Sequence, residues 1–203
     1  MLRVRDDDDC EAFEELVENF QSRIVAVLHH MVGGQHEAED LAQEVFLRVY
    51  KARKSYHPRA RFSTWLFTIA NNLALNRLRS KQRKPVVPLN LRESGPLGAR
   101  PEEQLAQDRS GRPEDRLASE ELSLVVQEAL NGLNERQRMA VVLNKFEDMG
   151  YAEIAEVMEL STKAVKSLLS RARANLRQAL RDYVLMDGEP VSQSIEDSEE
   201  SND

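Results

Sequence analysis

Basic side chains are concentrated in two segments of this chain that contain no acidic ones. Residues 48–84 contain eleven Lys or Arg and no Asp or Glu. Residues 162–181 contain six more, again without a carboxylate: Lys163, Lys166, Arg171, Arg173, Arg177 and Arg181. The formal net charge of the chain is −7, but a phosphate group responds to the local field rather than to the total charge. Both segments are therefore predicted to bind nucleic acid.

The first basic segment also contains an aromatic, Asn-rich run, FSTWLFTIANN, at residues 62–72. Trp65, Asn72, Asn76, Arg79 and Arg83 follow one another at steps of 7, 4, 3 and 4, which places them in one stripe along a helix. Asn is a poor residue for a helix interior, so two of them on one stripe indicate a function. Aromatic faces and amides bind unstacked bases, while cations follow the backbone. The stripe predicts a single-strand-binding surface, although for Trp65 packing in the core is an open alternative.

The second basic segment includes the second helix of a predicted helix-turn-helix at residues 151–170. Ala155 is small where the two helices would cross, Ser161 can cap the second helix, and Glu159 occupies the turn at a cost of about 1 kcal/mol relative to glycine. Polar and basic residues face away from the predicted buried side of the second helix. Such a face suits a DNA major groove, where short polar side chains reach base edges. The alternative is a basic helix that binds no ligand.

Helical periodicity of apolar residues recurs along most of the chain, and strand alternation is nearly absent. The predicted fold is all-α, with two small helical domains joined by a flexible linker and a helix-turn-helix in the second domain. Gly33 and Gly34 end the first long helix, His57-Pro58 ends the second, and Asn134 can cap a helix in the second domain. The predicted parts are an N-terminal domain at 1–84, a Pro- and Gly-rich linker at 85–118, a C-terminal domain at 119–183 and an acidic disordered tail at 184–203.

Several classes of protein are disfavoured by what the sequence lacks. No run of residues has the length and apolarity needed to cross a bilayer, and the first nine residues do not resemble a secretory signal, so we expect a cytoplasmic protein without membrane insertion. Cys10 is the only cysteine, and the four histidines have no metal-ligand spacing. Phosphate-binding glycine loops and nucleophile motifs are absent as well. We therefore expect no catalytic residue, no metal, no cofactor and no enzyme activity.

Five motifs in one order carry a resemblance to a known family. They are DLAQEVFLRVY at 40–50, FSTWLFTIANN at 62–72, NRLR at 76–79, LNERQRMAVVL at 133–143 and YAEIAEVMELSTKAVKSLLSRAR at 151–173. The sequence closely resembles bacterial extracytoplasmic-function sigma factors over roughly residues 11–84 and 119–181. The resemblance implies a protein that directs core RNA polymerase to promoters, recognises their minus-ten and minus-thirty-five elements, and promotes DNA melting. Its implied partners are core polymerase, through the beta-prime clamp and the beta subunit, promoter DNA, and an anti-sigma factor.

The resemblance also implies roles for individual residues. It assigns polymerase docking to Asp40, Gln43 and Glu44. It assigns binding of the minus-ten element to Arg61, Trp65, Asn72, Asn76, Arg77 and Arg79. It assigns binding of the minus-thirty-five element to Ser161, Thr162, Lys163, Lys166, Ser167, Ser170, Arg171 and Arg173.

Two other classes of function compete with this interpretation. A self-sufficient DNA-binding repressor or activator would use residues 151–173, but it would leave residues 36–84 without a purpose. An enzyme acting on nucleic acid would need clustered carboxylates or a metal site among the basic segments, where none is found. The sequence identifies neither the promoter nor the inducing signal.

Overall fold

The computed structural model describes all residues except 59, 84–112, 182 and 184–203. Its regular elements in these described parts are all helices, which confirms the all-α prediction. In chain order they are α1 (Leu2–Asp7), α2 (Cys10–Val32), α3 (Gln35–Lys51), the 3-10 turn η1 (Arg53–Ser55), α4 (Phe62–Arg83), α6 (Pro113–Asn131), α7 (Glu135–Lys145), α8 (Tyr151–Met158) and α9 (Thr162–Ala179).

The N-terminal domain is built on α2, α3 and α4, which pack against one another around an apolar core. Ile24 and Leu28 of α2, Val45 of α3, and Leu66 and Ala70 of α4 are completely buried in it. These positions recur at three- and four-residue steps on each helix, as the periodicity of the sequence predicts. The polar faces of α3 and α4 are left at the surface.

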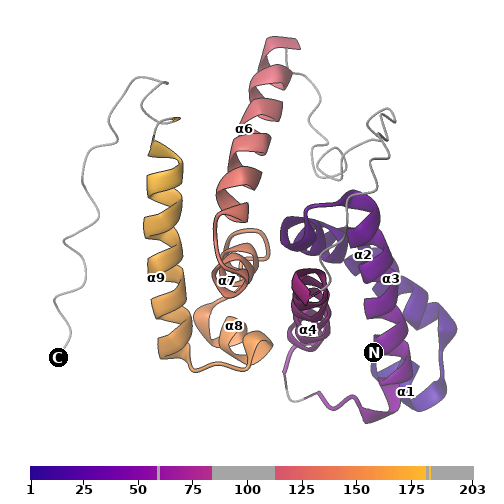
Figure 1. The fold of residues 1–203 in the computed structure, drawn as a ribbon. Coiled ribbons are helices and arrows are strands. Elements are labelled where there is room, and N and C mark those ends of the chain that lie inside the picture. The colour runs from indigo at the N-terminus through magenta and orange to yellow at the C-terminus, as the bar shows by residue number, and fades with distance from the viewer. Residues whose placement is uncertain (59, 84–112, 182, 184–203) are drawn as a thin grey trace.

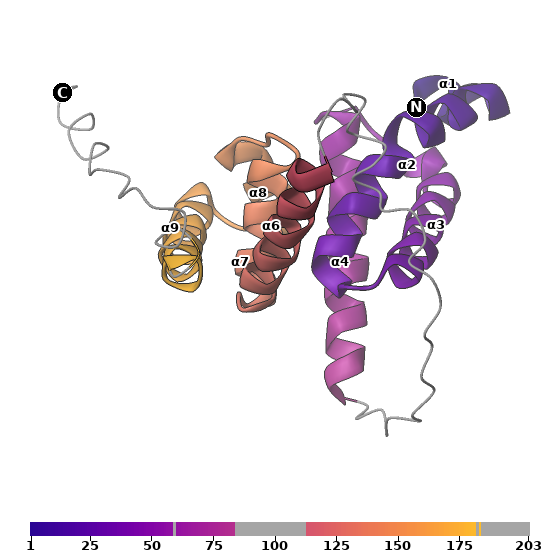
Figure 2. The ribbon, with the colours of Figure 1, turned by 90° about the horizontal axis from the view of Figure 1, so that it is seen from above.

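The C-terminal domain consists of α6, α7, α8 and α9. Its core contains Met139 and Leu143 of α7, Ile154 of α8, and Leu169 of α9, each of which is at most 1% exposed. Helix α9 lies at the side of this domain that is farthest from the N-terminal domain (Figures 1 and 2). Its outward face is therefore not covered by the described part of the chain.

The predicted helix ends agree with the backbone geometry. Gly33 ends α2 with φ 78°, a left-handed conformation that favours glycine. Asn134 and Ser161 cap α7 and α9, since their side chains accept hydrogen bonds from the amides of Gln137 and Ala164. Glu159 ends α8 with φ 54° and ψ 46°, so it occupies the left-handed position of the turn as predicted.

Three segments differ from the sequence prediction. Helix α1 was not expected, because only Val4 of its six residues is buried and so short a helix shows no period. The second long helix ends at Lys51, before the predicted break at His57-Pro58, and η1 follows it. Helix α6 already begins at Pro113, inside the segment predicted as linker. The rest of that linker and the acidic tail lie outside the described residues.

The two domains touch one another. Helix α4 lies between α2 and α3 on one side and the C-terminal domain on the other, where it packs against α8 (Figures 1 and 2). Helix α2 also contacts α7. Buried side chains of both domains thus belong to one continuous apolar cluster.

Candidate nucleic-acid and polymerase interfaces

Helix α9 separates an anchored face from an exposed polar face. Val165, Leu169 and Ala172 are buried, and Leu168 and Leu176 are partly buried against the core. The residues predicted to bind the minus-thirty-five element are all exposed: Ser161, Thr162, Lys163, Lys166, Ser167, Ser170, Arg171 and Arg173. The structure therefore brings this set together on one side of a single rigid helix.

Two members of this set also have structural contacts. The hydroxyl oxygen of Ser161 accepts a hydrogen bond from the backbone amide of Ala164 at 3.2 Å, which caps the helix. Arg173 donates from Nη2 to the hydroxyl of Tyr151 at 2.7 Å and so ties α9 to α8. Both side chains are thus held in place at the two ends of the exposed polar face.

None of the six basic side chains at residues 162–181 forms an ion pair with a carboxylate among the described residues. Their positive field is therefore not cancelled locally. Phosphate oxygens can approach such a surface without competing with a carboxylate from the described residues.

The predicted stripe on α4 is also at the surface, except at its beginning. Asn72, Asn76, Arg79 and Arg83 are exposed. Trp65 is partly buried and packs against the core, with its ring centroid 5.0 Å from that of Tyr56. Trp65 therefore contributes to the core and also has an accessible part.

Most described cations of residues 48–84 are paired with carboxylates that lie outside this run of residues. Those with such a partner are Arg48, Arg53, Lys54, Arg61, Arg77 and Lys81. Lys51, Arg79 and Arg83 are the described members of this run without an ion pair. The run has no acidic residue in sequence, but folding supplies acidic partners, so its free charge is smaller than the sequence indicated.

Two residues predicted to bind the minus-ten element are among these paired cations. Arg61 donates from Nη1 to Glu153 of α8 at 3.0 Å. Arg77 donates from Nε to Glu37 at 2.6 Å, and Lys81 binds the other oxygen of the same carboxylate. Burial alone would raise the pKa of Glu37, but the hydrogen bonds from Lys81 and Arg77 outweigh it and lower that pKa below its usual value. Glu37 thus remains ionised and competes with phosphate for both cations.

The predicted polymerase-docking residues lie along the surface of α3. Asp40 and Gln43 are exposed, and Glu44 is half-buried and accepts from Arg48 Nε at 2.8 Å. Leu47 follows one turn after Gln43 and is 53% exposed. The sequence prediction missed Leu47, which the periodicity places just outside the buried stripe.

Asn71 is a second residue that the sequence did not single out. It is 3% exposed, and its Oδ1 atom has no hydrogen-bond partner among the residues that the structure describes. A buried acceptor without a partner costs about 1–3 kcal/mol. Its neighbour Asn72 is exposed, so the two consecutive amides have opposite surroundings.

Several polar contacts join the two domains. Arg23 donates to Glu147 from Nε at 2.9 Å and from Nη2 at 2.5 Å. His30 contacts Gln127 through Nδ1 at 2.9 Å, and Arg138 donates to the carbonyl of Met31 at 2.9 Å. The Arg61–Glu153 ion pair is a further contact between the two domains.

The described residues contain no group of three or more His, Cys, Asp or Glu arranged to hold a metal ion. Within the same residues, every helix is too short or too polar to span a membrane.

Two family models match the chain, one in each domain. The model of Sigma-70 region 2 matches residues 16–84, and that of Sigma-70 region 4 matches residues 123–176. Both describe parts of sigma factors, the subunits with which bacterial RNA polymerase recognises promoters.

The curated relatives show to which group of sigma factors the chain is similar. The ECF RNA polymerase sigma factor SigW of Bacillus subtilis is 36% identical over 174 residues, which cover 86% of this chain and 91% of the relative. The RNA polymerase sigma-H factor of Pseudomonas aeruginosa is 31% identical over 177 residues, or 85% and 88% of the two chains. The chain therefore belongs to the extracytoplasmic-function (ECF) sigma factors of bacterial RNA polymerase, which confirms the resemblance seen in the sequence.

Solved structures share the architecture. CnrH, solved in complex with the cytosolic domain of CnrY, is 25% identical with a TM-score of 0.60 and covers 86% of this chain and 90% of its own. The sigma factor RpoE of Bartonella quintana, solved with the anti-sigma factor NepR, is 23% identical with a TM-score of 0.62, covering 84% and 98%. The second likeness supports the fold alone.

Proposed function

We propose that this ECF sigma factor engages polymerase and promoter through three separate surfaces. Helix α9 enters the major groove of the minus-thirty-five element, the exposed stripe of α4 holds the opened minus-ten element, and the polar face of α3 docks on the clamp of the beta-prime subunit. The observation that carries this proposal is the exposed face of α9, whose cations have no carboxylate partner in the described residues. Such a face, on a helix anchored by a buried opposite face, suits major-groove binding.

Within α9, side-chain length separates the roles. Ser167 and Ser170 are short, so they fit against base edges in the middle of the groove. Lys163, Lys166 and Arg171 reach further and bind base edges or phosphates. Arg173, held by Tyr151, lies at the end of the contact surface and binds backbone phosphate.

On α4, the exposed amides of Asn72 and Asn76 provide hydrogen bonds to unstacked bases, and Arg79 follows the strand backbone. Trp65 supports this surface from its partly buried position. Arg61 and Arg77 bind phosphate only after leaving Glu153 and Glu37. We therefore assign the amides a larger role in strand capture than these two arginines.

On α3, Asp40, Gln43 and Glu44 present acidic and amide groups, and Leu47 adds an exposed apolar side chain beside them. An apolar centre with polar groups around it is a common arrangement in protein interfaces. The beta subunit of polymerase is a second contact. The protein acts without a catalytic step of its own and in the cytoplasm, where polymerase transcribes.

An anti-sigma factor is a further expected partner. The related RpoE was solved with the anti-sigma factor NepR. Regulation of this chain by a protein of that kind would keep it from polymerase until a signal releases it.

Run-off transcription on genomic fragments tests the proposal directly. Core polymerase with this protein should start transcription at sites that core polymerase alone does not use. A variant with Lys166 and Arg171 both changed to Ala should lose most of this activity but still bind core polymerase. Tight, specific binding to duplex DNA without polymerase, together with no new start sites, would instead favour a self-sufficient repressor.

A further inference from the structure

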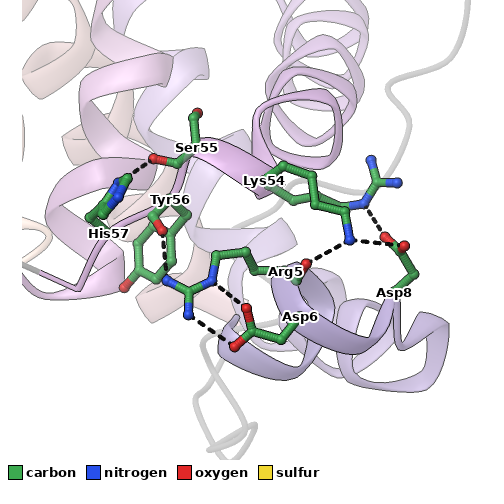
Figure 3. A network of polar contacts seen from close by, with 8 residues as sticks. Arg5, Asp6, Asp8, Lys54, Ser55, Tyr56 and His57 are labelled. Carbon is green, nitrogen blue, oxygen red and sulfur yellow. Dashed lines mark hydrogen bonds and ion pairs between the residues drawn. The ribbon is translucent and has the colours of Figure 1, made fainter.

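The N-terminal helix α1 lies outside the region that the sigma family model matches, which begins at residue 16. It is nevertheless docked on the domain, because Val4 is completely buried and α1 packs against η1 and α2. The side chains of Arg5 in α1 and of Asp8, which directly follows α1, point towards the connection between α3 and α4 (Figure 3). The contacts of this short helix are therefore made by residues that lie outside the matched family region.

Four polar contacts join residues 1–8 to residues 53–56. Arg5 donates from Nη1 to the carbonyl of Tyr56 at 3.0 Å, and Lys54 donates from Nζ to the carbonyl of Arg5 at 2.7 Å. Asp8 accepts from Arg53 Nε at 2.7 Å and from Lys54 Nζ at 2.9 Å. The hydrogen bonds from Lys54 and Arg53 lower the pKa of Asp8 below its usual value, so this carboxylate is ionised at neutral pH.

This connection leads directly to the aromatic residues at the beginning of α4. Tyr56 is 5% exposed, and its ring centroid lies 5.0 Å from that of Trp65 and 6.2 Å from that of Phe62. Phe62 and Trp65 are 6.1 Å apart. Arg5 therefore donates to the carbonyl of Tyr56, and the ring of Tyr56 packs against that of Trp65.

The contacts of Arg53 and Lys54 indicate positioning rather than simple neutralisation of charge. Arg53 also donates to the carbonyl of Tyr50 at 2.9 Å and lies over the Tyr50 ring at 4.1 Å. Lys54 is likewise bonded to a backbone carbonyl as well as to Asp8. Arg53 and Lys54 thus each bind a backbone carbonyl in addition to the Asp8 carboxylate, and together they connect the end of α1 to η1.

We propose that α1 is a positioning element for the aromatic group Tyr56, Phe62 and Trp65, with Arg5 as its positioning residue. By holding the Tyr56 backbone, α1 sets the orientation in which Trp65 is presented to the opened promoter strand. The presentation of Trp65 to the promoter strand rests on the proposed role of α4 in strand capture. The positioning of Trp65 by α1 concerns the free protein and is testable without DNA.

Trp65 is the only tryptophan of the chain, so intrinsic fluorescence reports on this residue alone. Arg5→Ala in the full chain should shift the emission of Trp65 and increase its quenching by acrylamide. The same variant should slow promoter opening, followed by permanganate reactivity of thymines, by about two- to tenfold, the range expected for one lost hydrogen bond. Binding to core polymerase and to upstream DNA should not change. Arg5→Lys, which keeps a cationic donor, should restore part of both signals.

Arg3→Ala is the matched control, because Arg3 lies on the same helix but pairs with Asp9 and does not contact residues 53–56. Its emission and opening rate should match the natural chain. Asp8→Asn provides a second variant, which should move both signals in the direction of Arg5→Ala while circular dichroism shows an unchanged helix content.

The outcomes separate the proposal from the function on which it rests. Unchanged Trp65 emission in both Arg5→Ala and Asp8→Asn would overturn the positioning role, whatever happens on promoters. Changed emission with an unchanged opening rate would show that α1 positions Trp65 but that Trp65 has no part in opening, which overturns the link to strand capture. Tighter DNA binding and faster opening in Asp8→Asn would mean that α1 masks the cations of η1, and the positioning role would again be wrong.

Discussion

Asn71 and Asn72 are adjacent in sequence but have opposite environments in the fold. Asn72 is exposed with Asn76 on the stripe that spacing predicts, whereas Asn71 is 3% exposed where α4 packs. Helical spacing identifies which residues share a face of one helix. It does not tell whether another helix covers the adjacent face, because the helices that pack against α4 are distant in sequence. The stripe could therefore be predicted and the burial of Asn71 could not.

At this scale we predict a specific defect for Asn76→Ala. Loss of the exposed amide removes hydrogen bonds to an unstacked base, so strand opening should slow by about two- to tenfold. Formation of the closed complex should be nearly unchanged, because Asn76 does not contribute charge. Permanganate reactivity measures opening, and mobility shift at low temperature measures the closed complex.

Asn19→Ala is a suitable control, since Asn19 is an exposed asparagine in the same domain that bonds only within its own helix, to the carbonyl of Glu15. It should behave like the natural chain. Equal defects of Asn76→Ala in closed-complex formation and in opening would show that the α4 stripe has no specific role in melting.

A second residue-scale prediction concerns Lys166. Its ammonium group is exposed without an ion pair in the described residues, so Lys166→Ala should weaken binding to upstream promoter DNA. If Lys166 contacts phosphate, the slope of log K against log salt should fall by about one unit. Lys145→Ala removes an exposed cation from α7 rather than from α9 and should leave the slope unchanged. A salt slope of Lys166→Ala equal to that of the natural chain would exclude a phosphate contact.

At the scale of elements, the residues that cap the beginning or the end of a helix were the most predictable. Gly33, Asn134, Ser161 and Glu159 all occupy the end positions that local chemistry assigns to them. Helix starts without such a signal were less predictable. Helix α6 begins at Pro113, inside a Pro- and Gly-rich segment, and proline suits the first turn of a helix as well as a linker. Composition alone does not separate these two uses of proline.

The polar face of α3 carries the element-scale prediction. Asp40 and Glu44 lie one turn apart, and neither contributes to the core. Changing both to Lys should abolish binding to core polymerase, measured by pull-down, because it reverses the charge at the proposed docking surface. Helicity by circular dichroism should stay the same.

The double change of Glu14 and Glu18 to Lys is the matched control, with the same charge change at the same spacing on exposed positions of α2. It should leave polymerase binding intact. Normal pull-down by the Asp40 and Glu44 double variant would assign docking to another face.

At the scale of the whole molecule, the distribution of charge differs between the two DNA-facing surfaces. Cations of residues 48–84 are mostly paired with the carboxylates of Asp8, Glu37, Glu44 and Glu153, whereas those of α9 are not paired with a carboxylate in the described residues. The sequence showed two similar basic segments, because carboxylates that are distant in sequence cannot be assigned to partners before the fold is known. We expect the free cations of α9 to dominate the first electrostatic contact with duplex DNA.

The packing of the two domains must also change during promoter recognition. The minus-ten and minus-thirty-five elements are separated by about two and a half turns of duplex, or roughly 85 Å at ~34 Å per turn. Domains of about 70 residues have radii of gyration near 11 Å, so two touching domains cannot reach both elements. The contact described here therefore belongs to the protein before it is extended on polymerase and DNA.

The Arg23–Glu147 ion pair gives this contact a predicted dependence on pH. The Glu147 side chain is only 4% exposed, and its burial raises the pKa of the carboxyl despite the hydrogen bonds from Arg23. Separation of the domains would return that pKa towards its ordinary value. The packed state therefore binds the proton more tightly, so the contact is strongest below the ordinary pKa and weakens as pH rises through the raised one.

Glu147→Gln should remove this part of the pH dependence, since the amide keeps the shape of the side chain but does not titrate. The measurement is energy transfer between one dye on α3 and one on α9, followed across the acidic range in the absence of polymerase. Transfer in the natural chain should fall with rising pH, and Glu147→Gln should flatten the curve. Glu156→Gln, at an exposed position of α8, should retain the natural curve. Identical curves for the natural chain and Glu147→Gln would mean that Glu147 does not control the separation of the domains.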